Sequence, residues 1–92
     1  MTIWCVNTAY HELFHDVYGV YSNLALAGNA AMQCFRNMQD IKKVRHDNDN
    51  VLTFRCIHES WGYTIVVFQH DITTEKVTIF ASIEIGKMEL DK

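Results

Sequence analysis

Hydrophobic and polar positions alternate most regularly in the last third of the chain. Between Lys76 and Ile85, apolar residues occupy every second position. Val51 to His58 alternates in the same way, and Tyr63 to His70 contains a continuous apolar run bounded by turn-like residues. Alternation with a period of two predicts strands, and short polar connections predict that consecutive strands pair antiparallel. We therefore expect a three-stranded antiparallel meander.

The first half of the chain has a different spacing. Thr2 to Asn7 is typical of a short strand, because β-branched and aromatic residues alternate there. From Ala9 to about Ala27, and again from Ala31 to Lys43, apolar residues recur every three or four positions, which predicts helices. Gly28-Asn29 lies between the two runs. Since Gly often ends helices and Asn often begins them, we expect a break or a kink there.

These elements predict one α+β domain covering residues 1–92. Its order is a short N-terminal strand, one long kinked helix or two helices, then the three-stranded antiparallel meander with helices on one face. The uncovered face is expected to carry Val66, Phe68, Thr78 and Phe80. Because this is apolar for a face in water, we interpret it as a surface for a protein partner or for a homodimer.

Trp61 lies in the turn between two predicted strands. A large aromatic residue in a turn is often exposed, and exposed Trp residues are common at the centres of protein interfaces. We therefore include Trp61 in the predicted partner-binding set. The alternative is that its ring folds back over the edge of the sheet.

Charge and composition exclude several classes of protein. The net charge is −3 and the one basic cluster, Lys42 to His46, is followed at once by acidic residues, so nucleic-acid binding is disfavoured. No apolar stretch is long enough to span a membrane, and the N-terminus does not resemble a signal peptide. The three cysteines form no C-x-x-C pair, which favours reduced, buried thiols. We therefore expect a cytoplasmic location.

One short motif carries candidate catalytic chemistry. The segment His11-Glu12-Leu13-Phe14-His15 resembles the H-E-x-x-H motif of zinc hydrolases. On a helix, His11 and His15 would lie one turn apart and could both bind zinc, while Glu12 could act as a general base on metal-bound water. The metzincin class is excluded, because Tyr18 and Tyr21 stand where its further Gly and His are required.

A catalytic zinc ion would need a third protein ligand. Glu59 is the first candidate, since a turn would allow it to reach the metal. Further candidates are Glu75, Glu84, His46, His58 and His70. The favoured interpretation of the motif is a packing role, because Phe14 lies on the apolar stripe of the predicted helix and the two histidines flank it. A structural metal pair or a pH-responsive patch is a third interpretation.

The sequence favours a small non-catalytic protein-interaction domain that needs no cofactor. An inhibitor or adaptor, of the kind that mobile genetic elements encode against host enzymes, fits its size and the lack of an evident active site. It would act through the exposed sheet face and the aromatic turn. Two alternatives stay open: a minimal zinc-dependent hydrolase, and a sheet-face binder of RNA or a small ligand.

Overall fold

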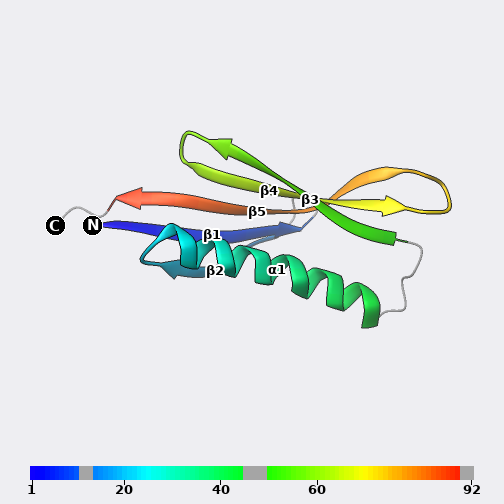
Figure 1. Ribbon diagram of the computed structural model, residues 1–92, viewed down its shortest axis with the longest axis horizontal. Coiled ribbons are helices and arrows are strands. Elements are labelled where there is room, and N and C mark those ends of the chain that lie inside the picture. The colour runs from blue at the N-terminus through cyan, green and yellow to red at the C-terminus, as the bar shows by residue number, and fades with distance from the viewer. Residues whose placement is uncertain (11–13, 45–49, 90–92) are drawn as a thin grey trace.

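A computed structural model describes residues 1–10, 14–44 and 50–89, and only the backbone of residues 10, 14–18 and 41–44. The elements follow the chain as β1 (Thr2–Tyr10), β2 (Phe14–Tyr21), α1 (Leu24–Val44), β3 (Asn50–Glu59), β4 (Gly62–Asp71) and β5 (Val77–Glu89). The strands form one antiparallel sheet of five strands in the order β2-β1-β5-β4-β3 (Figure 1). The described chain is therefore an α+β fold, as the sequence predicts.

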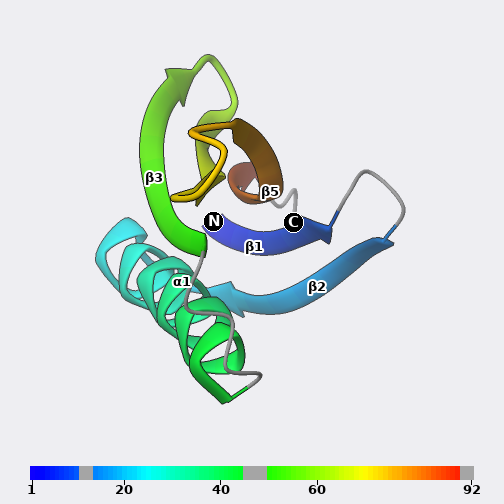
Figure 2. The ribbon, with the colours of Figure 1, turned by 90° about the vertical axis from the view of Figure 1, so that its right-hand side faces the viewer.

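The helix covers only part of this sheet. It packs mainly on β1, β2 and β5, whereas the end of β3 and its hairpin with β4 extend beyond it (Figure 2). The described chain is elongated, with extents of 53 × 24 × 23 Å. No helix in the described ranges is both long and apolar enough to cross a bilayer.

The core lies between α1 and the face of the sheet that it covers. Met38 from the helix and Ile83 from β5 are among the largest fully buried side chains. Burying one such side chain contributes about 1.5–3 kcal/mol. The remaining buried members of this cluster are Val6, Ala27, Ala31, Cys34, Phe35, Leu52, Ile65, Val67, Ala81 and Ile85. Their spacing matches one face of a helix and one face of each strand.

Helix α1 begins at a well-formed cap. The Asn23 side-chain oxygen accepts a hydrogen bond of 2.9 Å from the backbone N–H of Leu26, which satisfies one free donor of the first turn. The helix then runs through Gly28 and Asn29 without interruption, so the predicted break is wrong. Ala27 and Ala31 are buried on either side of Gly28, and this packing outweighs the local preference of glycine for a helix end.

The helix predicted from Ala9 to about Ala27 is wrong over most of its length, because α1 begins only at Leu24. Strand β1 continues to Tyr10, and the segment Phe14–Tyr21 is strand β2, paired antiparallel with β1. The register shifts inside this pair, because Val6 pairs with Gly19 and Asn7 with Val17. The extra residue breaks the alternation of β2, so that its apolar residues fall at helix-like intervals. The β-branched and aromatic content of the segment is the signal that favoured a strand.

The predicted meander is confirmed as strands β3, β4 and β5. The predicted ranges fall short of the observed strands by one residue at the ends of β3 and β4. Strand β5 begins one residue later than predicted and extends to Glu89, because its last residues continue to pair with β1 after the ladder with β4 has ended at Gly86. The first and last strands are therefore neighbours, and the start of β1 lies beside the end of β5 (Figure 1).

Candidate protein-binding surfaces

The meander carries an apolar surface on the face away from α1. Residues paired across an antiparallel ladder share a face. Thr53 pairs with Phe68 and Phe68 with Ile79, while Val51 pairs with His70 and His70 with Val77. These six residues form what we call the outer patch: Val51, Thr53, Phe68, His70, Val77 and Ile79.

The aliphatic members of the outer patch are exposed to solvent. The exposed fraction is 63% for Ile79, 55% for Val77 and 46% for Val51, while Phe68 lies half-buried between them. Adjacent large apolar groups at the surface are typical of a site that another molecule covers. The outer patch therefore has the composition of a docking surface.

A polar contact lies within the same surface. Thr53 Oγ1 and His70 Nε2 are 2.7 Å apart, a hydrogen bond between β3 and β4. This contact limits the rotation of the imidazole ring. It leaves one oriented polar group among aliphatic side chains, which is the usual composition of a specific interface.

The turn between β4 and β5 is held next to the outer patch by Asp71. One carboxylate oxygen of Asp71 accepts hydrogen bonds from the Thr73 hydroxyl at 2.7 Å, the Thr73 N–H at 2.9 Å and the Thr74 N–H at 3.2 Å. These donors, led by the Thr73 hydroxyl, hold the pKa of Asp71 below its usual value. The turn also contains Glu75 in the left-handed region at φ 60°.

A bulge in β5 changes which residues reach the outer patch. Val67 pairs with Ala81, but the next residue, Phe68, pairs with Ile79. Phe80 is therefore an extra residue, and the alternation of β5 reverses across it. The sequence predicts Phe80 on the outer face, and this is wrong, because its half-buried ring packs against the core.

The bulge accounts for most of the other differences from the predicted face. Thr78 pairs with Gln69 and lies on the opposite face from Phe68, although it is exposed. Val66 and Phe68 share the outer face as predicted. Val77 and Ile79 were missed, because an unbroken alternation assigns residues 77 and 79 to the core side. Val51 was also missed, but it lies in β3 and the bulge does not affect it.

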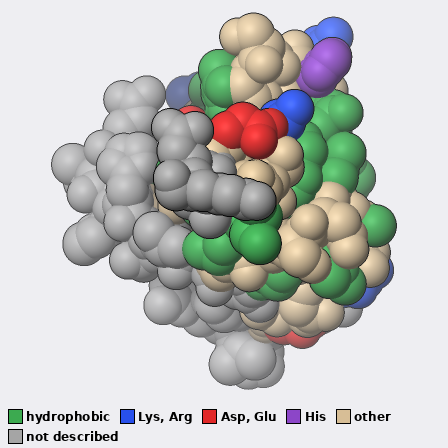
Figure 3. Space-filling view, turned by 90° about the vertical axis from the view of Figure 1, so that its left-hand side faces the viewer, with side chains coloured by type: hydrophobic (Ala, Val, Ile, Leu, Met, Phe, Trp, Pro, Cys, Tyr) green, Lys and Arg blue, Asp and Glu red, His purple; other side chains and the backbone are tan. Residues whose placement is uncertain are grey.

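Trp61 lies at the other end of the meander. It occupies the turn between β3 and β4, is 42% exposed, and its carbonyl accepts a hydrogen bond of 2.8 Å from the Lys87 N–H. Along β4, Trp61 is about 23 Å from Phe68, at roughly 3.3 Å per residue. The structure therefore does not bring these two predicted binding residues together. In Figure 3, hydrophobic side chains gather along one side of the end of the molecule that carries this hairpin.

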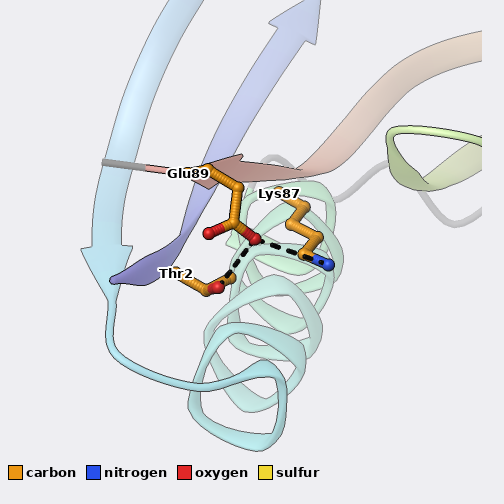
Figure 4. A network of polar contacts seen from close by, with 3 residues as sticks. All are labelled: Thr2, Lys87 and Glu89. Carbon is orange, nitrogen blue, oxygen red and sulfur yellow. Dashed lines mark hydrogen bonds and ion pairs between the residues drawn. The ribbon is translucent and has the colours of Figure 1, made fainter. Parts of the chain in front are cut away.

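A polar cluster joins the ends of β1 and β5 (Figure 4). The Thr2 hydroxyl donates a hydrogen bond of 2.8 Å to Glu89 Oε1, and Lys87 Nζ lies 3.6 Å from the same oxygen. The Thr2 hydroxyl, with a smaller contribution from Lys87, lowers the pKa of Glu89. All three groups connect the first strand to the last, and this arrangement suits a structural contact rather than a reaction.

The predicted zinc ligands are distributed over the sheet. The H-E-x-x-H geometry depends on a helix. The prediction of a helix at His15 is wrong, because this residue lies in β2 opposite Ala9. Glu59 ends β3, so these two candidates lie on opposite edge strands. His11 and Glu12 lie outside the described residues, as does His46.

The other predicted ligands have different surroundings. The His58 ring stacks on Tyr63 at 4.9 Å, while His70 contacts Thr53 in the outer patch. Glu75 lies in the turn before β5, and Glu84 lies within β5. Among the residues that the structure describes, no three His, Cys, Asp or Glu side chains gather where they could hold one metal ion. The zinc hydrolase stays a prediction that rests on the motif alone.

The cysteines correct one further expectation. Cys34 is buried in the helix, as predicted, but Cys56 is exposed on β3 and Cys5 is half-buried. None of the three forms a disulfide bond. Cys56 is exposed because α1 does not extend over this part of β3.

Comparison with protein-family models, with curated proteins and with solved structures finds no match to this chain. Its function is therefore argued from its own residues.

Proposed function

We propose that this chain is a non-catalytic protein-interaction domain whose outer patch docks on a protein partner. It would act in the cytoplasm, where its free thiols stay reduced, as an inhibitor or an adaptor. Trp61 is then a second exposed feature, about 23 Å along β4 from Phe68. The partner would present an apolar surface with a hydrogen-bonding group opposite His70.

The exposure of Ile79 beside Val77 and Val51 is the single observation that carries this proposal. These residues come from two strands and are aligned by the ladder through β4, so they form one surface rather than scattered apolar groups. Isolated exposed apolar residues are ordinary on proteins, whereas adjacent ones favour a binding site. Phe68 and His70 supply the larger ring surfaces between them.

The composition of the rest of the chain supports binding over catalysis. Asp71 and Glu89 both have a lowered pKa, and hydrogen bonds within a turn or between strand ends account for both shifts. Active sites usually contain ionisable groups shifted by burial or by a close charge in a cleft. An apolar patch on an ordered sheet is the better supported candidate.

Chemical crosslinking followed by affinity capture from the source cells tests this proposal with a matched pair of variants. Ile79→Asp places a charge in the outer patch, and Leu26→Asp places the same charge at an exposed apolar position of α1. We expect one partner in constant ratio to the bait for the unaltered chain and for Leu26→Asp, and a loss of at least tenfold for Ile79→Asp. Circular dichroism would verify that both variants are folded.

Two results would contradict the outer patch as the docking surface. The first is capture of the same partner by Ile79→Asp at the level of the unaltered chain. The second is an equal loss for both variants, since the effect of charge would then not depend on position.

A further inference from the structure

Strand β3 is an unprotected edge of the sheet. Its register with β4 is regular over ten residue pairs, it contains no Pro or Lys, and most of its side chains are exposed. Proteins usually shield such edges with lysine, proline, a bulge or a covering element, because free backbone groups pair with other strands. The opposite edge, β2, is packed by α1 and interrupted by a register shift.

The helix restricts access to the first half of β3 only. The Phe54 ring meets Phe35 of α1 edge-to-face, with ring centroids 4.9 Å apart, and Leu52 is buried. The later part of the strand runs away from the helix toward its hairpin with β4 (Figure 1). The segment Arg55–Glu59 is therefore the part of the edge that a further strand can reach.

The side chains of this segment on the outer face form a self-complementary pattern. Arg55, Ile57 and Glu59 point to the same side, as basic, apolar and acidic residues in turn. Arg55 and Glu59 are about 13 Å apart along the strand, at roughly 3.3 Å per residue, so they do not pair with each other. Among the described residues, neither takes part in an ion pair.

We propose that the free edge of β3 binds a second copy of this chain, antiparallel and centred on Ile57. In that register each Arg55 lies opposite Glu59 of the second copy, so two ion pairs flank the contact between the two Ile57 side chains. Opposite charges paired across strands stabilise a sheet, and like charges directly opposite destabilise it. A two-fold axis makes both contacts identical, as in most homodimers.

Other two-fold registers are less favourable. Centring the pair on Arg55 would place two guanidinium groups opposite each other. Centring it on Phe54 would require the second strand to occupy the half of β3 next to α1. A centre at Cys56 would pair Arg55 with Ile57 and leave its charge without a partner. Only the register centred on Ile57 uses the accessible segment and pairs its charges.

This dimer would have a defined consequence for the outer patch. Because the two-fold axis is perpendicular to the sheet, both outer patches would lie on the same side of one continuous sheet. The contact involves about five residues from each strand. The surface area that it buries should therefore be smaller than the roughly 1,200 Å² of a stable interface, and we expect a dissociation constant in the micromolar range or weaker. The inference does not depend on what the outer patch binds.

Sedimentation equilibrium over a range of concentrations tests the dimer by charge reversal. We expect Arg55→Glu and Glu59→Arg each to weaken self-association at least tenfold, because each creates two like-charge contacts. The double variant restores the pairs in reverse order and should recover the association of the unaltered chain. Arg36→Glu, at an exposed position of α1, is the matched control and should have no effect.

A disulfide trap tests the register independently. Ile57→Cys in a Cys56→Ser background places two thiols opposite each other, and oxidised glutathione should link them. Thr53→Cys in the same background is the control and should react several-fold more slowly. A chain that is monomeric at every concentration would overturn the proposal. So would a double charge variant that stays monomeric, or equal linkage at residues 53 and 57.

Discussion

Two isoleucines of one strand have opposite environments. Ile83 and Ile79 lie four residues apart in β5, yet Ile83 is fully buried and Ile79 is 63% exposed. Ile83 faces α1, whereas the bulge at Phe80 turns Ile79 to the face that no element of the described chain covers. The difference shows that residue type alone does not define this core. A side chain belongs to it only where the strand register directs it toward the helix.

The largest expected effect comes from truncating these two residues in turn. Ile83→Ala should lower the free energy of unfolding by about 2–5 kcal/mol, because it leaves a cavity beneath α1. Ile79→Ala should change it by about 0.5 kcal/mol or less, since the removed atoms are already in water. Urea unfolding of both variants measures the difference. Equal losses would mean that Ile79 is packed in solution, and would also remove the basis of the outer patch.

A second pair of residues tests the same contrast between crowded and open positions, here across β4 and β5. Gly62 and Gly86 face each other across β4 and β5. A Cβ on Gly62 would overlap the Ile85 carbonyl oxygen, and its φ of +148° suits glycine, whereas a Cβ on Gly86 would meet nothing within 4 Å. Gly62→Ala should therefore destabilise the fold by roughly 2 kcal/mol or more.

Gly86→Ala is the control for this substitution. It should be neutral or stabilise the chain by up to about 0.5–1 kcal/mol, because alanine loses less backbone entropy than glycine in a strand. Thermal unfolding of both variants is sufficient. A destabilised Gly86→Ala would indicate that this part of the ladder is more crowded than the structure has it.

A smaller gain is expected from the covering helix itself. A Cβ on Gly28 would meet nothing within 4 Å, and the residue lies inside α1. Gly28→Ala should therefore stabilise the fold by about 0.5–1 kcal/mol. Asn29→Ala is the control, at an exposed position of the same helical turn. It shows how much stability a higher helix propensity alone contributes at this point. A loss of stability in Gly28→Ala would contradict an uninterrupted helix at this point.

The smallest expected effect is a response to acid. The pKa values of Asp71 and Glu89 are both lowered in the folded chain, from ordinary values of 3.8 and 4.5. A lowered pKa contributes stability that is fully present above the ordinary value and is lost as the pH falls through the folded value. Unfolding temperatures measured from pH 6 to pH 3 should decrease less in Asp71→Asn and Glu89→Gln than in the unaltered chain. Because both groups are exposed, the difference should be small.

The sequence is sufficient to predict the meander, since its strands alternate between polar turns and each pairs with its neighbour in the chain. It is not sufficient for β2, whose alternation is broken by a register shift, nor for the cap at Asn23. On the outer face, the sequence predicts the positions of Val66 and Phe68 correctly. The error at Phe80, Thr78, Val77 and Ile79 has a single cause, because a bulge depends on pairing with another strand and leaves no local signal.

Because Phe80 is one extra residue in β5, it reverses the direction of every side chain that comes before it in the strand. With Phe80 present, Val77 and Ile79 lie on the outer face of the sheet. In a chain that lacked this residue, the same two side chains would lie on the face that α1 covers. A homologue with a one-residue gap at Phe80 should therefore have an apolar residue at the position of Thr78 and polar residues at those of Val77 and Ile79. If these replacements are absent, the homologue has lost the apolar surface even though its sequence looks similar.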